Sequence, residues 1–346
     1  MQIDRRQLLR SLPPFLIASS APWMWSPLQA AKPRLCAALL VPLTGPRAAL
    51  ARSMERAAML AQGDSDKKAL KVFDTSGTPE GATAAARAAR KSGATIILGP
   101  LFGREVSAVL GLIGRAMPVV SFSNDSALLD SGAFVFGITA RQAASSILRY
   151  AASRGIRRIA IGGVNDGWGM QARAAASNIS KDLGLDAYLL PAEGLGQPDS
   201  GALPDAVLMT DAAALARIGP VIDRQRVQLL GIVQGLDLTP EMFRALEGAW
   251  LAAPDPAGFA GFARAFEERF GTRPGTITGL AYDATNIFRQ MRLGGDTDRS
   301  ALLSASGFKG VCGDVRFRED GSVARALAIL AIADGKLRTI SQGTIT

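Results

Sequence analysis

Histidine is absent from this 346-residue sequence, and its absence removes several kinds of chemistry at once. Without histidine there is no Ser-His-Asp or Cys-His catalytic arrangement, no histidine-ligated zinc and no imidazole proton shuttle. Cysteine is nearly as scarce, because Cys36 and Cys312 are the only two, each among apolar neighbours. The sequence therefore favours two buried free thiols over a disulfide bond.

Sequence motifs that would identify an enzyme are also missing. The chain has no Walker loop, no Gly-x-Ser-x-Gly turn, no Cys-x-x-Cys pair and no Gly-x-Gly-x-x-Gly after a predicted strand. Acidic residues do cluster at Asp199, Asp205 and Asp211, but they stand in or beside predicted turns, where solvated carboxylates are the simpler interpretation. We therefore expect a non-catalytic protein with neither a cofactor nor a metal.

The charge is basic but dispersed. The net charge is +9 and the isoelectric point about 10.1. Lysine and arginine form no long run and are not interleaved with aromatic residues, as they often are in nucleic-acid-binding surfaces. We expect a solvated basic surface and no nucleic-acid partner.

Residues 1–30 have the features of an export signal. Arg5-Arg6 precedes an apolar region that is short for a membrane span and is broken by prolines, and Ala30 offers a small residue for cleavage. The arginine pair resembles a twin-arginine signal, although ordinary secretion is the alternative. Cys36 lies inside the first apolar strand and not at a lipidation position, so we expect a periplasmic protein that is neither lipidated nor stably inserted in a membrane.

Apolar runs alternate with helical patterns from Arg34 onwards, and this is typical of a parallel sheet covered on both faces. The predicted strands and helices of the first half are Leu35–Val41, Ala48–Gln62, Leu70–Phe73, Pro79–Ser92, Thr95–Leu98, a helix containing Val106 to Ile113, and Pro118–Phe122. The second series comprises Ala140–Arg154, Arg158–Ile161, a helix ending near Gly184, Ala187–Leu190, Ala206–Met209, Gln228–Val233, Gly258–Phe270, Thr276–Arg292 and Ala326–Ala333, with turns at Asp320-Gly321 and Asp334-Gly335.

The pattern predicts an α/β protein of two Rossmann-like lobes with a cleft between them. We expect residues 33–137 and 250–320 to form lobe one, and residues 138–249 and 323–346 to form lobe two. A cleft between two lobes is the default place for a ligand. In lobe one the loops that follow strands, at Gly99–Gly103 and at Ser123–Asp125, should border it, because ligands bind at the carboxyl ends of parallel strands. The alternative for Ser123–Asp125 is that these polar residues cap the next segment of the chain.

Six short motifs in order resemble the type I periplasmic solute-binding proteins of the leucine/isoleucine/valine-binding family. They are Leu40–Pro46, Ile97–Leu101, Pro118–Asn124, Asn165–Gly169, Ala281–Ala284 and Gly307–Phe317. The resemblance spans nearly the whole chain after the signal. It implies two lobes joined by three crossovers, closing on a small polar solute that an ABC permease then receives.

The ligand contacts of this family can be carried over residue by residue. Gly103 stands where amino-acid-binding members place a serine for the ligand carboxylate, Asp125 where they usually have threonine, and Gln234 where an acidic residue pairs with the ligand ammonium. Trp168 keeps its aromatic type, either covering a ligand or packing within its lobe. The candidate ligand contacts are Phe102, Gly103, Ser123, Asn124, Asp125, Trp168 and Gln234.

These departures disfavour an α-amino acid bound in the family manner, because a carboxylate at position 125 would repel the ligand carboxylate. The same fold also occurs in periplasmic activators of penicillin-binding proteins, and the Gly-Pro-Leu and Ser-Phe-Ser-Asn-Asp motifs resemble that subgroup equally well. The sequence therefore leaves two hypotheses, a solute-binding protein of an ABC importer and a regulator that binds a peptidoglycan synthase.

Overall fold

Strand β1 (Ala37–Val41) is an interior strand of the first of two large sheets, and all five of its residues are buried. The computed structural model describes residues 35–63, 67–164, 166–191, 203–232, 239–304 and 306–345. The predicted signal at residues 1–30 and the candidate Gln234 lie outside these described residues.

The first sheet has five parallel strands in the order β2-β1-β3-β4-β5. The other strands are β2 (Leu70–Asp74), β3 (Ile96–Leu98), β4 (Val119–Ser121) and β5 (Phe134–Val135). Its connecting helices are α1 (Ala48–Gln62), α2 (Pro79–Lys91) and α3 (Gly103–Ile113), with single 3-10 turns at Lys67–Ala69 and Ser126–Leu128.

Alternation along β1 explains why the predicted strand is continuously apolar. Leu39 belongs to a hydrophobic cluster shared with α1 and α9 (Thr276–Gly294), whereas Leu40 belongs to a cluster on the opposite face shared with α2 and α3. Successive side chains of a strand point to opposite faces, so a sheet with helices on both sides needs apolar residues at every position.

The second sheet has seven strands in the order β14-β13-β10-β9-β8-β6-β7. They are β6 (Arg158–Gly162), β7 (Asp186–Leu189), β8 (Ala206–Met209), β9 (Gln228–Gly231), β10 (Trp250–Ala253), β13 (Ala328–Ala333) and β14 (Lys336–Ser341). The helices of this part are α4 (Ala140–Ser153), α5 (Gly167–Asp182), α6 (Ala212–Ile218) and α7 (Pro240–Ala245). Strands β6 to β10 are parallel, and β13 runs antiparallel to β10 and to β14.

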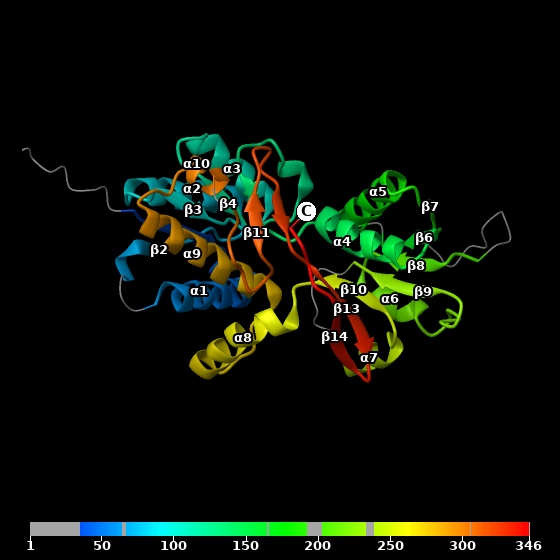
Figure 1. Cartoon of the computed structure of the whole chain (residues 1–346). Coiled ribbons are helices and arrows are strands. Elements are labelled where there is room, and N and C mark those ends of the chain that lie inside the picture. The colour runs from blue at the N-terminus through cyan, green and yellow to red at the C-terminus, as the bar shows by residue number, and fades with distance from the viewer. Residues whose placement is uncertain are drawn as a thin grey trace, which may run out of the picture. The chain divides into compact units, whose positions relative to one another are not determined.

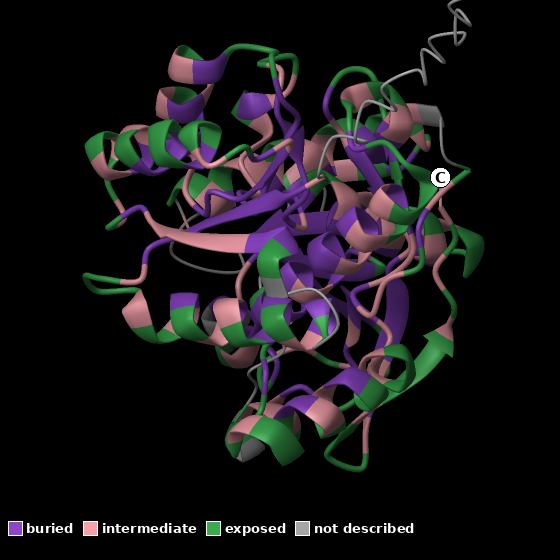
Figure 2. Cartoon of the chain, turned by 90° about the vertical axis from the view of Figure 1, so that its left-hand side faces the viewer, coloured by how far each residue is buried: buried purple, intermediate pink, exposed green. Residues whose placement is uncertain are grey.

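Helices α8 (Pro256–Phe270), α9 and α10 (Arg299–Ser304) return the chain to the first sheet, followed by the hairpin of β11 (Val315–Phe317) and β12 (Val323–Arg325). Helix α9 packs on α1, with Thr278 and Ser53 hydroxyls 3.0 Å apart. In Figure 1 the orange α9 and α10 accordingly lie in one lobe with the blue and cyan elements, and the red β13 and β14 lie with the green and yellow ones. Figure 2 shows how the surface helices alternate between buried purple and exposed green.

The sheet pairing places two boundaries differently from the sequence. Residues 250–253 form β10, which pairs with β9 and β13 in the seven-stranded sheet, although we expected residues from 250 onwards in lobe one. Residues 323–325 form β12, whose Val323 packs in the core beside the five-stranded sheet, although we expected them in lobe two. Below, lobe one means the described residues within 35–137 and 254–325, and lobe two means those within 138–253 and 326–345.

The two cysteines are both buried and free, as the sequence predicted. The Cys312 thiol lies 3.5 Å from the Thr276 carbonyl oxygen, and burial raises its pKa well above the usual value. A protonated, buried thiol packs as a small apolar group and has little reactivity.

Candidate functional site

The loop after β3 leads directly into the first turn of α3. Phe102 is the residue before the helix, and its N–H donates to Glu105 Oε2 at 3.0 Å, satisfying one of the free donors at the helix start. Glu105 is fully buried, and this burial raises the pKa of its carboxyl, a shift opposed by hydrogen bonds from Thr75 and from the Phe102 N–H. The interactions of Glu105 therefore fix the position of Phe102 at the edge of the sheet.

The loop after β4 places Asp125 against the same helix start. A Cβ atom added to Gly103 would lie 3.0 Å from Asp125 Oδ2 and 3.7 Å from Ser123 Oγ. Ser123 is buried and accepts a hydrogen bond from the Asp125 N–H at 3.2 Å. The carboxylate of Asp125 thus lies beside Gly103, the first residue of α3, where amino-terminal backbone N–H groups favour a negative charge.

Asp125 also contacts lobe two. Its Oδ1 accepts one hydrogen bond from the Ala127 N–H and another from Gln171 Nε2 of α5, each at 3.0 Å. The first of these caps the short 3-10 turn after β4, while the second joins the two lobes. The sequence did not single out Gln171, because a half-buried glutamine in a helix carries no distinctive pattern.

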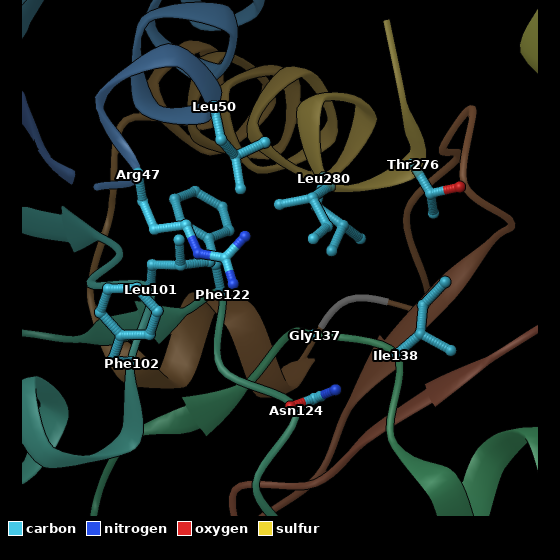
Figure 3. Close-up of a pocket in the computed structure, with 11 residues that line it drawn as sticks. Arg47, Leu50, Leu101, Phe102, Phe122, Asn124, Gly137, Ile138, Thr276 and Leu280 are labelled. Atoms are coloured by element: carbon cyan, nitrogen blue, oxygen red, sulfur yellow. The ribbon is translucent and has the colours of Figure 1, made fainter. Parts of the chain in front are cut away.

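A cavity of about 260 Å³ lies at the carboxyl end of the first sheet. Figure 3 shows the side chains of Leu50 and Leu280 reaching into it from one side and Asn124 lying on the other. Its lining residues come from the loops after β1, β3, β4 and β5 and from the first turns of α1 and α9: Arg47, Leu50, Leu101, Phe102, Phe122, Asn124, Gly137, Ile138, Thr276, Ile277 and Leu280. Seven of these side chains are aliphatic or aromatic, so the walls are mainly apolar.

Two of the predicted contacts, Phe102 and Asn124, line this cavity. Gly103, Ser123 and Asp125 lie together beside it and are not among its lining residues. That any of the five touches a ligand stays a prediction.

Trp168 has a structural environment within lobe two. Its indole Nε1–H donates to the Thr210 carbonyl at 2.9 Å, and the ring packs against the hydrophobic cluster beneath α4 and α5. It does not line the cavity described above. Of the two interpretations that the sequence left open, these contacts support packing within the lobe.

Arg47 is the main lining residue that sequence reasoning missed. It follows Gly45-Pro46 in the loop after β1 and precedes the first turn of α1. Because this loop also leaves the carboxyl end of a parallel strand, the topological argument used for the loops after β3 and β4 applies to it equally. Thr276 and Leu280 carried no such signal, since they are brought to the cavity by α9 from more than 220 residues further along the chain.

Within the described ranges, no group of three or more cysteine, aspartate or glutamate side chains is placed to hold a metal ion. Among the same residues, no helix is both long enough and apolar enough to cross a bilayer.

Comparison with known proteins identifies the family. A sequence profile of the family described as periplasmic binding protein matches residues 37–216, more than half of the chain, and the chain therefore belongs to that family. This membership confirms the class predicted from the six motifs and the α/β architecture of two lobes. No protein with a curated function matches the chain significantly.

Solved structures share the fold at low sequence identity. A candidate branched-chain amino acid ABC transporter protein from Rhodospirillum rubrum is 21% identical with a TM-score of 0.76, covering 88% of this chain and 99% of its own. A solute-binding protein of an ABC transporter from Rhodopseudomonas palustris, solved with 3,4-dihydroxybenzoic acid, is 19% identical with a TM-score of 0.65, covering 90% and 98%. The C-domain of LpoA from Haemophilus influenzae, a regulator of PBP1A, is 16% identical with a TM-score of 0.67, covering 88% and 99%.

Proposed function

We propose that this protein is the periplasmic solute-binding component of an ABC importer, that it binds a small polar solute between its lobes, and that it has no catalytic activity. The observation that carries the proposal is the cavity at the carboxyl end of the lobe-one sheet, lined from four strand-end loops and two helices. In this proposal Phe102 and Asn124 contact the solute directly, and an ABC permease receives it. Export would depend on the signal at residues 1–30.

A thermal-shift screen of the purified protein tests this proposal. The panel contains amino acids, amides, short peptides, aromatic acids and muropeptides; aromatic acids are included because the Rhodopseudomonas palustris neighbour was solved with one. A solute at a hundred times its dissociation constant stabilises the folded state by about 2.7 kcal/mol, and at about 2–4 °C per kcal/mol the melting temperature would rise by several degrees. A flat screen of protein shown to be folded by circular dichroism would contradict the proposal.

The second candidate function is regulation of a peptidoglycan synthase through a protein contact. Asp125 favours it, because this carboxylate stands beside the helix start where amino-acid-binding relatives would hold the ligand carboxylate. The structural similarity to the LpoA C-domain, a regulator of PBP1A, also supports this second function. Here a pull-down with immobilised protein should recover a penicillin-binding protein in a yield that added solutes do not change.

A further inference from the structure

The charge at the cavity comes from one residue. Among the described residues that line it, Arg47 is the only cationic one and none is acidic. The Arg47 side chain is exposed, and its guanidinium forms no hydrogen bond or ion pair with the described part of the chain. Figure 3 shows it extending from the start of α1 over Phe122 into the cavity.

Neighbouring arginines are engaged elsewhere. Arg104 donates from Nη2 to the Gly77 carbonyl at 3.0 Å, and its guanidinium lies 5.9 Å from the centre of the Phe102 ring. Arg52 donates from Nη1 to the Leu43 carbonyl at 3.2 Å. Arg47 therefore has five uncommitted N–H donors in a planar fork, a geometry that matches a carboxylate.

The alternative place for a ligand carboxylate is already occupied by the chain itself. Asp125 lies beside the start of α3, so a second carboxylate there would meet a like charge. An ammonium group is no better placed, because no acidic side chain is among the described lining residues and Oδ1 of Asp125, beside the cavity, already accepts hydrogen bonds from Ala127 and Gln171. The cavity thus favours one negative group near Arg47 and disfavours a zwitterion.

The remaining walls define the rest of the ligand. Leu50, Phe122 and Leu280 surround the middle of the cavity with apolar surface. Beyond them, the Asn124 amide and the Thr276 hydroxyl can each hydrogen-bond a neutral polar group. At about 260 Å³ the cavity suits a small ligand.

We propose that the solute is a small monocarboxylate with an apolar or aromatic body, and that Arg47 binds its carboxylate. This inference rests on the proposed solute-binding function and names the substrate class. Hydrogen bonds to a charged group account for about a 10- to 100-fold gain in affinity, which makes the contribution of Arg47 measurable.

The test is a thermodynamic cycle measured by calorimetry on the purified protein. The ligands are 4-hydroxybenzoate and 4-hydroxybenzamide, which are similar in shape and differ in charge, with leucine as the zwitterion. The variants are Arg47→Gln and, as a matched control, Arg87→Gln, which replaces an exposed arginine of α2 outside the cavity. We expect the wild type and Arg87→Gln to bind the acid at least about tenfold more tightly than the amide, and Arg47→Gln to bind the two within about twofold of each other.

Three results would overturn the inference. If Arg47→Gln weakens the acid and the amide equally, Arg47 shapes the cavity without binding the carboxylate. If leucine binds more tightly than the acid, the substrate class is wrong while the solute-binding function stands. If no solute of the wider panel binds, the proposed function itself fails and the substrate class falls with it.

Discussion

Gln171 of α5 donates a hydrogen bond from Nε2 to Oδ1 of Asp125 at 3.0 Å, joining a lobe-two helix to the loop after β4. The two residues are 46 positions apart in the sequence. Asp125 is held at the same time by Ala127 and lies beside Gly103, so the position of a lobe-two helix is linked to the start of α3 through one carboxylate.

Replacing Gln171 should loosen the link between the lobes. We expect Gln171→Ala to lower the free energy of unfolding by about 1 kcal/mol, the usual value of a partly exposed hydrogen bond. We also expect the solute-free variant to have a greater radius of gyration than the wild type in small-angle X-ray scattering. Gln225→Ala, at an exposed turn, is the control; identical scattering from both variants would argue against a link between the lobes.

A substitution of Trp168 can distinguish packing within lobe two from contact with a ligand. Trp168→Phe keeps an aromatic ring, smaller than the indole, but leaves the Thr210 carbonyl without its donor. We therefore expect stability to fall by about 1–3 kcal/mol and the affinity for any solute found in the screen to change by less than about twofold. Trp250→Phe, which keeps the aromatic contact with Tyr150, is the control. A tenfold loss of affinity at an unchanged melting temperature would instead place Trp168 in the site.

Gly99 is where the chain tolerates no side chain. Its φ is +103°, and an added Cβ would lie 2.2 Å from the carbonyl oxygen of Leu40 in the buried strand β1. The control is Gly93, whose φ is +81° but whose Cβ would have no atom within 4 Å. Gly93→Ala should cost about 1–2 kcal/mol from the backbone conformation alone.

Gly99→Ala should cost several kcal/mol more or prevent folding, because it adds a clash with backbone that the sheet holds in place. Urea denaturation of both variants, or the yield of folded protein, measures the difference. Equal losses at the two positions would show that the contact with Leu40 can relax.

The buried carboxyl of Asp283 should make the free energy of unfolding depend on pH in an unusual way. It is buried in α9 and accepts hydrogen bonds from the N–H groups of Val311 at 2.8 Å and Cys312 at 2.9 Å. Burial is the main influence and raises its pKa to about 6, although those N–H donors and Arg325 act in the opposite direction. Since the folded pKa lies above the unfolded value, the folded state binds more protons between about pH 4 and pH 6, and the contribution of Asp283 to stability falls as pH rises through that range.

The measurement compares wild type with Asp283→Asn by denaturation at pH 4.5 and pH 7. We expect the stability advantage of the wild type to shrink by about 2 kcal/mol between the two pH values. For Asp298→Asn the difference should stay constant, because hydrogen bonds from the Ala301 N–H and the Ser300 hydroxyl lower the pKa of Asp298. A constant difference at Asp283 as well would mean that its carboxyl titrates below this range.

Long periodic helices and short apolar strands were predictable from the sequence, whereas short helices and a polar edge strand were not. The expected helix Ala48–Gln62 has these bounds in α1, and the Asp-Gly pairs do mark the β11–β12 and β13–β14 hairpins. Strand β14 was missed because it is an exposed edge strand with no apolar alternation, and α6, α7 and α10 are too short to show a period.

Only those parts of the candidate site that follow from the sheet topology were predictable from the sequence. The rule that ligands gather at the carboxyl ends of parallel strands selected the loops containing Phe102 and Asn124, which do border the cavity. It could not select Leu280, because only the packing of α9 on α1 brings that residue there. Arg47 was passed over because an isolated arginine in a sequence looks like ordinary solvated surface.

Because Arg47 is exposed, a substitution there can change which ligand binds with little effect on the stability of the fold. Its side chain belongs to none of the hydrophobic clusters, and substitutions at such surface positions usually change stability by less than about 0.5 kcal/mol. A descendant of this protein could therefore exchange an anionic solute for a neutral one through a single substitution without a compensating change in the core. Gly99, which also follows a strand of this sheet, cannot be substituted in the same way. As related proteins diverge, the identity of the bound solute should therefore change long before the structure of the sheet does.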